Sequence, residues 1–414
     1  MALALQSLMG FVVLYAIAWV ISEKRSVINW RTVFGAIILQ IIVFILLFKF
    51  PWFKDMSLLL NEALNGVAAA TREGTKFVFG YLGGAEPPFK VEPGSSPFIL
   101  MTQALPLIIV VSALSSLLFY LRILPMIVNA FSWVLKKSIG VGGAVGVSTA
   151  ANIFLGTVEA PMFIKPYLAK LSRGELFITM AGGMAGIAGT VMVLYGIILA
   201  PVVPEVIGHL LVVSFISAPA AVAFSALMVP HEGPVTDGDI TVDRPSSSMM
   251  DAVTQGTVEG VASYINVAAM LIVLTALIAL ANALLGLPFA KGAGPTLQGI
   301  FGWFMAPVVW LIGIPWSEAQ TAGALMGTKT VLNEFIAFLD LAKLGPEALT
   351  ERSRVIMIYA LCGFANFASI GIIIGGLGSI CPERRSDIID MGYKSLIAGT
   401  LATLSCGALV GIAY

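Results

Sequence analysis

Long apolar runs, separated by short charged or Gly- and Pro-rich loops, occupy most of the chain. Each run is long enough for a membrane crossing, and the runs lie at 3–21, 33–50, 98–134, 175–201, 206–228, 261–285, 354–380 and 396–412. The run at 98–134 is expected to be one span that ends at Lys136 and Lys137. The pattern therefore predicts an all-α integral membrane protein with about eight transmembrane helices.

Three other stretches differ from a plain span. Residues 56–70 alternate apolar and polar positions at helical spacing, which predicts an amphipathic helix on the membrane surface, with a small soluble cap as the alternative. Residues 140–171 and 300–341 are apolar but interrupted by acidic residues, Gly and Pro. Irregular backbone at membrane depth is tolerated only where it is buried in protein or lines a cavity. These two stretches are therefore predicted to be re-entrant hairpins.

Clusters of Lys and Arg set the predicted orientation, because loops rich in these residues stay in the cytoplasm. The loops at 23–31 and 382–385 carry such clusters, which places both chain termini on the periplasmic side. The first apolar run has no small-residue cleavage site and is expected to be a retained helix. By the same count, the first hairpin enters from the cytoplasmic side and the second from the outside.

The two hairpins belong to halves that match in pattern. Residues 157–159 precede a Gly-rich span at 183–188, and residues 330–334 precede a similar segment at 363–368. Together with the opposed entry sides, this indicates an inverted repeat with both acidic tips near the midplane of the membrane. The predicted organisation is a scaffold part, a first transport repeat, a linker with a scaffold span, and a second transport repeat, at 1–134, 135–229, 230–297 and 298–414.

Composition adds little beyond the membrane assignment. The chain of 414 residues is 58% hydrophobic and 11% charged, and its mean hydropathy is +0.96, so its solvent is the lipid bilayer. Lys plus Arg and Asp plus Glu balance at 23 each, which gives no reason to expect a nucleic-acid partner. The 42 Gly and 21 Pro favour close helix packing and broken helices. The three cysteines lack metal-site spacing.

The chemistry of the hairpin tips points to a binding site. An ionisable residue at membrane depth usually serves function, although Glu159 in a surface loop is the alternative. The expected lining consists of hydrogen-bonding groups and one ring: Thr157, Glu159, Asn333, Glu334, Phe364, Asn366 and Ser369. Apart from Lys329, neither tip holds a cation, so the substrate is expected to be neutral, hydroxylated and ring-bearing. No catalytic motif is visible, which predicts a protein that is not an enzyme; an intramembrane hydrolase stays the alternative.

Several ordered motifs resemble those of the concentrative nucleoside transporter family. They cover nearly the whole chain and include residues 150–154, 159–161, 175–177, 315–319, 329–335, 362–370 and 384–385. The resemblance implies eight spans, two opposed hairpins, an interfacial helix and a homotrimer in a bacterial inner membrane. It also implies elevator-like movement of the hairpin domain against a fixed scaffold, and symport of nucleosides with a cation. The alternative is another neutral hydroxylated solute.

The resemblance further assigns roles at the site. Glu334, Asn366 and Ser369 are expected to hold the ribose hydroxyls, while Phe364 and Val191 pack on the nucleoside. Glu159 and the two residues before it, Thr157 and Val158, are expected to face the base. Where the family usually has Gly-Gln-Thr/Ser-Glu, this chain has Gly156-Thr157-Val158-Glu159. The long amide is therefore missing, which leaves the base preference undetermined.

The same resemblance bears on the identity of the coupling ion. In sodium-dependent members, carbonyls at positions matching Asn152, Leu155 and Ile187 hold the ion with two hydroxyls, but the hydroxyl positions here are Val158 and Gly186. Sodium needs several oxygen ligands. The carboxyl groups of Glu159 and Glu334 are expected to lie in a partly dry cavity, where a carboxyl takes up a proton more readily than in water. We therefore expect proton coupling, with sodium held by carbonyls and water as the alternative, and no other cofactor.

Overall fold

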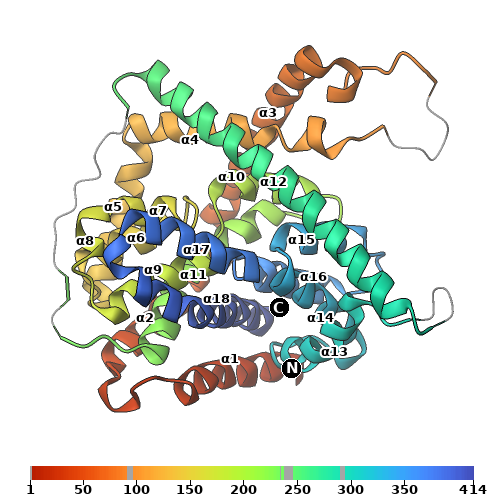
Figure 1. Ribbon diagram of the computed structural model, residues 1–414. Helices are drawn as coiled ribbons and strands as arrows, with labels where there is room; N and C mark the ends of the chain where they lie inside the picture. The colour runs from red at the N-terminus through yellow and green to blue at the C-terminus, as the bar shows by residue number, and fades with distance from the viewer. Residues whose placement is uncertain (1, 91–96, 234, 237–245, 290–293) are drawn as a thin grey trace.

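The computed structural model describes residues 2–90, 97–233, 235–236, 246–289 and 294–414 (Figure 1). Every regular element in these ranges is a helix, which confirms the all-α prediction. Within the described residues, seven helical segments are long and apolar enough to cross a membrane, or eight if the bent pair Leu297–Leu311 and Trp316–Val331 counts as one span. The seven are α1 (Ala2–Val20), α2 (Trp30–Lys49), η3–α4 (Leu100–Ala104 and Leu107–Tyr120), α9–α10 (Arg173–Ala185 and Gly189–Leu199), α11 (Val206–Met228), α12 (Met249–Gly286) and η4–α18 (Pro382–Arg384 and Arg385–Ala413).

The predicted span at 354–380 is a pair of shorter helices. They are α16 (Glu351–Leu361) and α17 (Phe367–Ile380), separated by an irregular segment that begins at Cys362. The predicted loops at 83–96, 230–248 and 288–295 lie partly outside the described residues. The short 3-10 helices η1 (Arg25–Val27) and η2 (Gly80–Gly83) lie in the remaining connections.

The expectation of one continuous span at 98–134 is wrong. The η3–α4 segment already has the length of a crossing, and the chain then turns at Arg122, whose φ of 65° lies in the left-handed region. A second helix, α5 (Ile123–Ile139), follows and packs against α2 and α6. The predicted domain division after residue 134 therefore falls inside α5.

The helix predicted at 56–70 is longer than expected. It is α3 (Pro51–Phe79), and one of its faces carries Leu64, Val67 and Ala68 against Leu107 and Val111 of α4 and Val193 of α10. Its place on the membrane surface stays a prediction.

Each repeat contains short helices at the predicted hairpin, in matching order. In the first repeat α5 is followed by α6 (Gly143–Ala151), α7 (Glu159–Met162) and α8 (Lys165–Leu168). In the second, α13 (Leu297–Leu311) is followed by α14 (Trp316–Val331) and α15 (Glu334–Lys343). α13 is bent by 118° from α14, so the predicted segment 300–341 is broken there, and Glu334 begins the next helix, α15. Re-entry into a bilayer stays a prediction.

The helices pack as a large body with a separate pair along one side. α11 is buried at the centre of the body and contacts α2, α9 and α18, while α1 lies against α18. α4 packs mainly on α12, and α12 crosses the opposite side of the molecule from α1 (Figure 1). In packing terms α1 and α2 therefore belong with the repeats, which differs from their predicted place in the scaffold.

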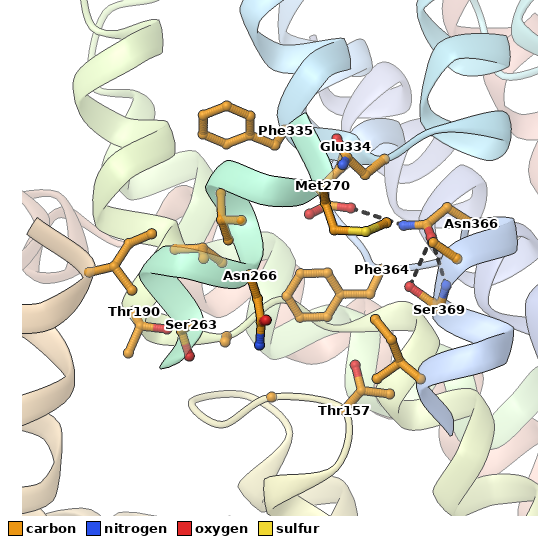
Figure 2. Close-up of a pocket in the computed structure, with 18 of the residues that line it drawn as sticks. Thr157, Thr190, Ser263, Asn266, Met270, Glu334, Phe335, Phe364, Asn366 and Ser369 are labelled. Atoms are coloured by element: carbon orange, nitrogen blue, oxygen red, sulfur yellow. Dashed lines mark hydrogen bonds between the residues drawn. The ribbon is translucent and has the colours of Figure 1, made fainter. Parts of the chain in front are cut away.

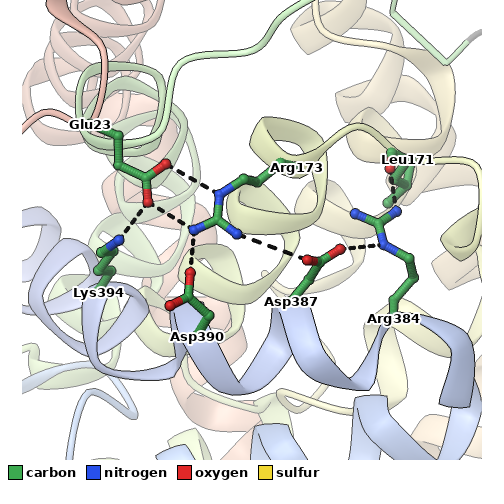
Figure 3. Close-up of polar contacts among 7 residues, drawn as sticks. All are labelled: Glu23, Leu171, Arg173, Arg384, Asp387, Asp390 and Lys394. Carbon is green, nitrogen blue, oxygen red and sulfur yellow. Dashed lines mark hydrogen bonds and ion pairs between the residues drawn. The ribbon is translucent and has the colours of Figure 1, made fainter.

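A cluster of ion pairs joins one end of this body (Figure 3). Arg173, at the start of α9, bonds the Glu23 carboxylate at 2.9 and 3.2 Å and also contacts Asp390 of α18. Lys394 of α18 pairs with Glu23 as well. Hydrogen bonding from Arg173 lowers the pKa of the Glu23 carboxyl to about 2. The α1–α2 loop is thereby fixed to both repeats.

Candidate functional site

The two broken spans cross at their breaks. α9 ends at Ala185 and α10 begins at Gly189, while α16 ends at Leu361 and α17 begins at Phe367. The Phe364 amide donates to the Gly186 carbonyl at 3.1 Å, so each break satisfies a backbone group of the other. A Cβ at Gly363 would lie 2.9 Å from the Ala185 carbonyl oxygen. Glycine at this crossing is therefore required by close backbone approach.

Asn366 connects the start of α17 to the second hairpin. Its Oδ1 accepts from the Ser369 amide at 2.9 Å and from the Ser369 hydroxyl at 3.0 Å, which caps the helix. Its Nδ2 donates to Glu334 Oε2 at 3.3 Å. Asn333 caps α15 in the same way, through the Ile336 amide at 2.9 Å. Two capped helix N-termini thus hold a buried amide and a buried carboxylate side by side (Figure 2).

Tyr195 of α10 is a site residue that the sequence reading missed. Its hydroxyl donates to Glu334 Oε1 at 2.7 Å, and its side chain is fully buried. A tyrosine hydroxyl inside an apolar span needs a partner, and this was the available signal. Glu334 therefore has a donor on each carboxylate oxygen, one from each repeat.

The first hairpin contributes Thr157, Val158 and Glu159. The Thr157 hydroxyl donates to the Gly183 carbonyl at 3.3 Å, and Val158 packs on Gly376 of α17. The Glu159 side chain is exposed, unlike that of Glu334. The expectation of a partly dry environment is therefore wrong for Glu159 and correct for Glu334.

These groups surround a cavity of about 300 Å³, within the size range of small-molecule sites. The structure brings the eight predicted substrate residues to its wall: Thr157, Val158, Glu159, Val191, Glu334, Phe364, Asn366 and Ser369. The opposite wall comes from α12, with Ser263, Asn266 and Met270 (Figure 2). The contribution of α12 to the cavity was not predicted from the sequence. No Lys, Arg or His is among the described residues that line the cavity, so it suits a neutral ligand.

Lys329, the cation of the second tip, does not line this cavity. It is fully buried and its Nζ donates to the Ala360 carbonyl at 2.7 Å and the Thr403 hydroxyl at 2.9 Å. Ala360 lies in the last turn of α16, where carbonyls lack helical partners. Lys329 therefore donates to a backbone carbonyl at the C-terminal end of α16, where the span is broken.

Two of the proposed ion ligands, Asn152 and Leu155, lie in the first hairpin, and the Asn152 carbonyl comes close to Gly186, the neighbour of Ile187. The Asn152 side chain is buried, and neither its oxygen nor its nitrogen has a hydrogen-bond partner among the residues that the structure describes. Among the described residues, the backbone carbonyls of Asn152, Leu155 and Ile187 accept no backbone hydrogen bond. A Cβ at Gly186 would lie 2.9 Å from the Asn152 carbonyl oxygen, so a hydroxyl-bearing side chain at 186 requires a shift. In the described part of the chain, no three acidic, His or Cys residues form a metal cluster.

Models of known protein families match three parts of the chain. They are "Na+ dependent nucleoside transporter C-terminus" at 209–411, "Na+ dependent nucleoside transporter N-terminus" at 9–82 and "Nucleoside recognition" at 101–202.

Relatives match over nearly the whole length of this chain. A nucleoside permease, NupC, of Helicobacter pylori is 34% identical over 99% of this chain and 97% of its own. An uncharacterized transporter of Haemophilus influenzae is 39% identical over 99% and 97%. The chain covers 62% of the rat sodium/nucleoside cotransporter 2, with 30% identity.

A solved structure, CNTnw in an inward-facing substrate-bound state, has 36% identity and a TM-score of 0.90. The match covers 99% of this chain and 97% of CNTnw. The matched relatives are named as transporters and permeases, which excludes the intramembrane enzyme. The chain belongs to the concentrative nucleoside transporter family.

Proposed function

We propose that the protein imports nucleosides across a bacterial inner membrane as a cation-coupled secondary active symporter. One observation carries this proposal. Glu334, Asn366 and Ser369 converge on a cavity whose described lining contains no Lys, Arg or His. A carboxylate beside an amide and a hydroxyl can accept from and donate to vicinal ribose hydroxyls. A neutral substrate needs no Lys or Arg side chain to bind it.

The base lies on the other side of the cavity in this proposal. Phe364 and Val191 supply an aromatic face and an apolar contact, and Glu159 with Thr157 and Val158 lies along the edge. Thr157 already donates to Gly183, and its side chain is short. Base recognition through the first hairpin is therefore weaker than a long amide would give, and ribose contacts supply most of the affinity.

The packing supports alternating access by movement of the large body. The α4–α12 pair faces the cavity as a separate wall, so sliding the body along this wall would carry the site across the membrane. The wall would be the fixed scaffold at the centre of a homotrimer. Both chain termini would lie in the periplasm.

For the coupling ion we favour the proton. Glu334 is a buried carboxyl that touches the site, so a proton on it and a nucleoside beside it would travel together. Val158 and Gly186 offer no hydroxyl to sodium. Sodium is the second candidate, because the open carbonyls near Asn152 and its unsatisfied side chain could bind it with water.

Uptake into proteoliposomes tests both the substrate and the ion. Radiolabelled uridine and adenosine are offered under an inward proton gradient without sodium, and under a sodium gradient at equal pH. Accumulation under the proton gradient alone is expected, since one charge moved through 100 mV supplies about 2.3 kcal/mol. Accumulation only with the sodium gradient would refute proton coupling, and accumulation of neither nucleoside would refute nucleoside import.

A further inference from the structure

α12 carries a polar stripe on one face of an otherwise apolar helix. Gln255, Glu259, Ser263 and Asn266 follow each other at intervals of four, four and three residues, which is the spacing of one helix face. Val258 and Val261, which lie between them on another face, are apolar and exposed. Polar groups inside a membrane span normally face protein or a water-filled cavity. The stripe therefore marks a wet surface along α12.

α4 holds a matching polar patch beside this stripe. Gly256 and Gly260 of α12 let the two backbones approach, since a Cβ at Gly260 would lie 2.7 Å from the Ile109 Cα. The α4 serines Ser112, Ser115 and Ser116 lie beside this contact. The two helices thus form one wall with hydroxyl groups next to the stripe.

A second cavity, of about 380 Å³, lies between this wall and the first hairpin. It shares Gly156, Glu159, Ala188, Thr190 and Ser263 with the first cavity, so the two are adjoining chambers of one cleft. Gln255 and Glu259 lie toward the start of α12, which follows the predicted cytoplasmic linker. The second cavity is therefore on the cytoplasmic side of the first.

The second cavity has the chemistry of a binding site. In the described part of the chain, the Glu259 carboxylate and the hydroxyls of the three α4 serines form no hydrogen bond with another residue, whereas Gln255 already bonds Asp251 and Ser246. Aromatic faces are present too, because Phe119 of α4 stacks on Phe163 of the first hairpin with 5.0 Å between ring centroids. The described lining again contains no Lys, Arg or His.

We propose that this cavity is a second nucleoside-binding station, which receives the substrate after it leaves Glu334 and before it enters the cytoplasm. Glu259 and the α4 serines would hold ribose hydroxyls there, and the aromatic residues would contact the base. Because Glu159 and Thr190 line both chambers, the substrate would pass from one to the other without crossing an apolar barrier. This inference rests on the proposed nucleoside transport.

Protection of an introduced thiol tests the station in the purified full-length protein. Ser115→Cys places a reporter in the second cavity, while the native Cys362, Cys381 and Cys406 are buried. N-ethylmaleimide labelling is measured with increasing uridine or adenosine, in the native background and with Glu334→Gln, which disables the first site. Met162→Cys, an exposed position on the opposite wall of the cavity, is a second reporter should the first variant fold poorly. Met250→Cys, an exposed position at the start of α12 that lines neither cavity, is the control.

We expect nucleoside to slow labelling of Ser115→Cys in both backgrounds and to leave labelling of Met250→Cys unaffected. Adding Glu259→Gln should raise the half-protecting concentration about tenfold, as expected when a hydrogen bond to a charged group is lost. Loss of protection with Glu334→Gln would overturn the second station but not nucleoside transport. Protection by sodium chloride but not by choline chloride, with no nucleoside present, would overturn it in favour of a cation site. Absence of protection in every background, together with absence of uptake, would count against the proposed function itself.

Discussion

Replacing Asn366 separates the structural and binding roles of one side chain. Its Oδ1 caps α17 through the Ser369 amide and hydroxyl, while its Nδ2 bonds Glu334 and has a second hydrogen available to the cavity. Asn366→Ala removes both functions. Asn366→Ser keeps a side chain that is favourable at a helix N-cap but removes the amide donors.

The expected magnitudes follow from these contacts. Loss of the cap costs about 0.5–2 kcal/mol of stability, and loss of a hydrogen bond to a charged group costs about 1.5–3 kcal/mol. The second amide hydrogen would bond a neutral ribose hydroxyl, which is worth about 0.5–1.5 kcal/mol; at 1.4 kcal/mol for each tenfold change, its loss weakens nucleoside binding about 2- to 10-fold. Both variants lose the bond to Glu334 and should lose nucleoside affinity, but only Asn366→Ala also loses the cap, so Asn366→Ala should be the less thermally stable of the two.

Equilibrium binding of radiolabelled uridine and thermal unfolding of the purified protein measure the two effects. Asn282→Ala is the matched control, because this asparagine of α12 bonds the Leu297 amide at 2.7 Å and does not line the cavity. Native affinity in Asn366→Ser would refute the assignment of the amide to substrate binding. Native stability in Asn366→Ala would refute the capping argument.

Three further predictions concern other parts of the molecule. Glu334→Gln should abolish transport in proteoliposomes while the protein remains folded, because a neutral amide cannot replace the carboxylate that accepts from Tyr195 and Asn366. Thr157→Gln should change the ranking of competing bases more than the need for ribose, as measured by inhibition of uridine uptake. Glu23→Gln should lower thermal stability at pH 7, because Arg173 depresses the Glu23 pKa. That stability is present above pH 4.5 and is lost as the pH falls toward 2, so the difference from the native protein should shrink over this interval.

Most spans could be predicted from the sequence because a membrane crossing needs a long apolar run whatever its partners are. The α4–α5 boundary was missed because Arg122 takes a left-handed conformation without glycine, although Pro125 in the first turn of α5 was a usable signal. The grouping of α1 and α2 with the repeats could not be predicted, because apolar faces do not specify which helix they contact.

The candidate site was predictable where polar residues interrupt apolar segments, as at Glu334 and Asn366. Tyr195 was not identified, because its partner lies 139 positions away in the chain and only the fold brings them together. The burial difference between Glu159 and Glu334 also depends on tertiary packing, which local sequence does not encode. The polar stripe on α12 was readable from spacing but had no evident partner before α4 was placed beside it.

The structure of the purified protein with bound uridine tests the central claim most directly. We expect the ribose hydroxyls to lie within hydrogen-bonding distance of Glu334 and Asn366, and the base to pack against Phe364. Uridine bound elsewhere, with the Glu334–Asn366 pair unoccupied, would contradict it.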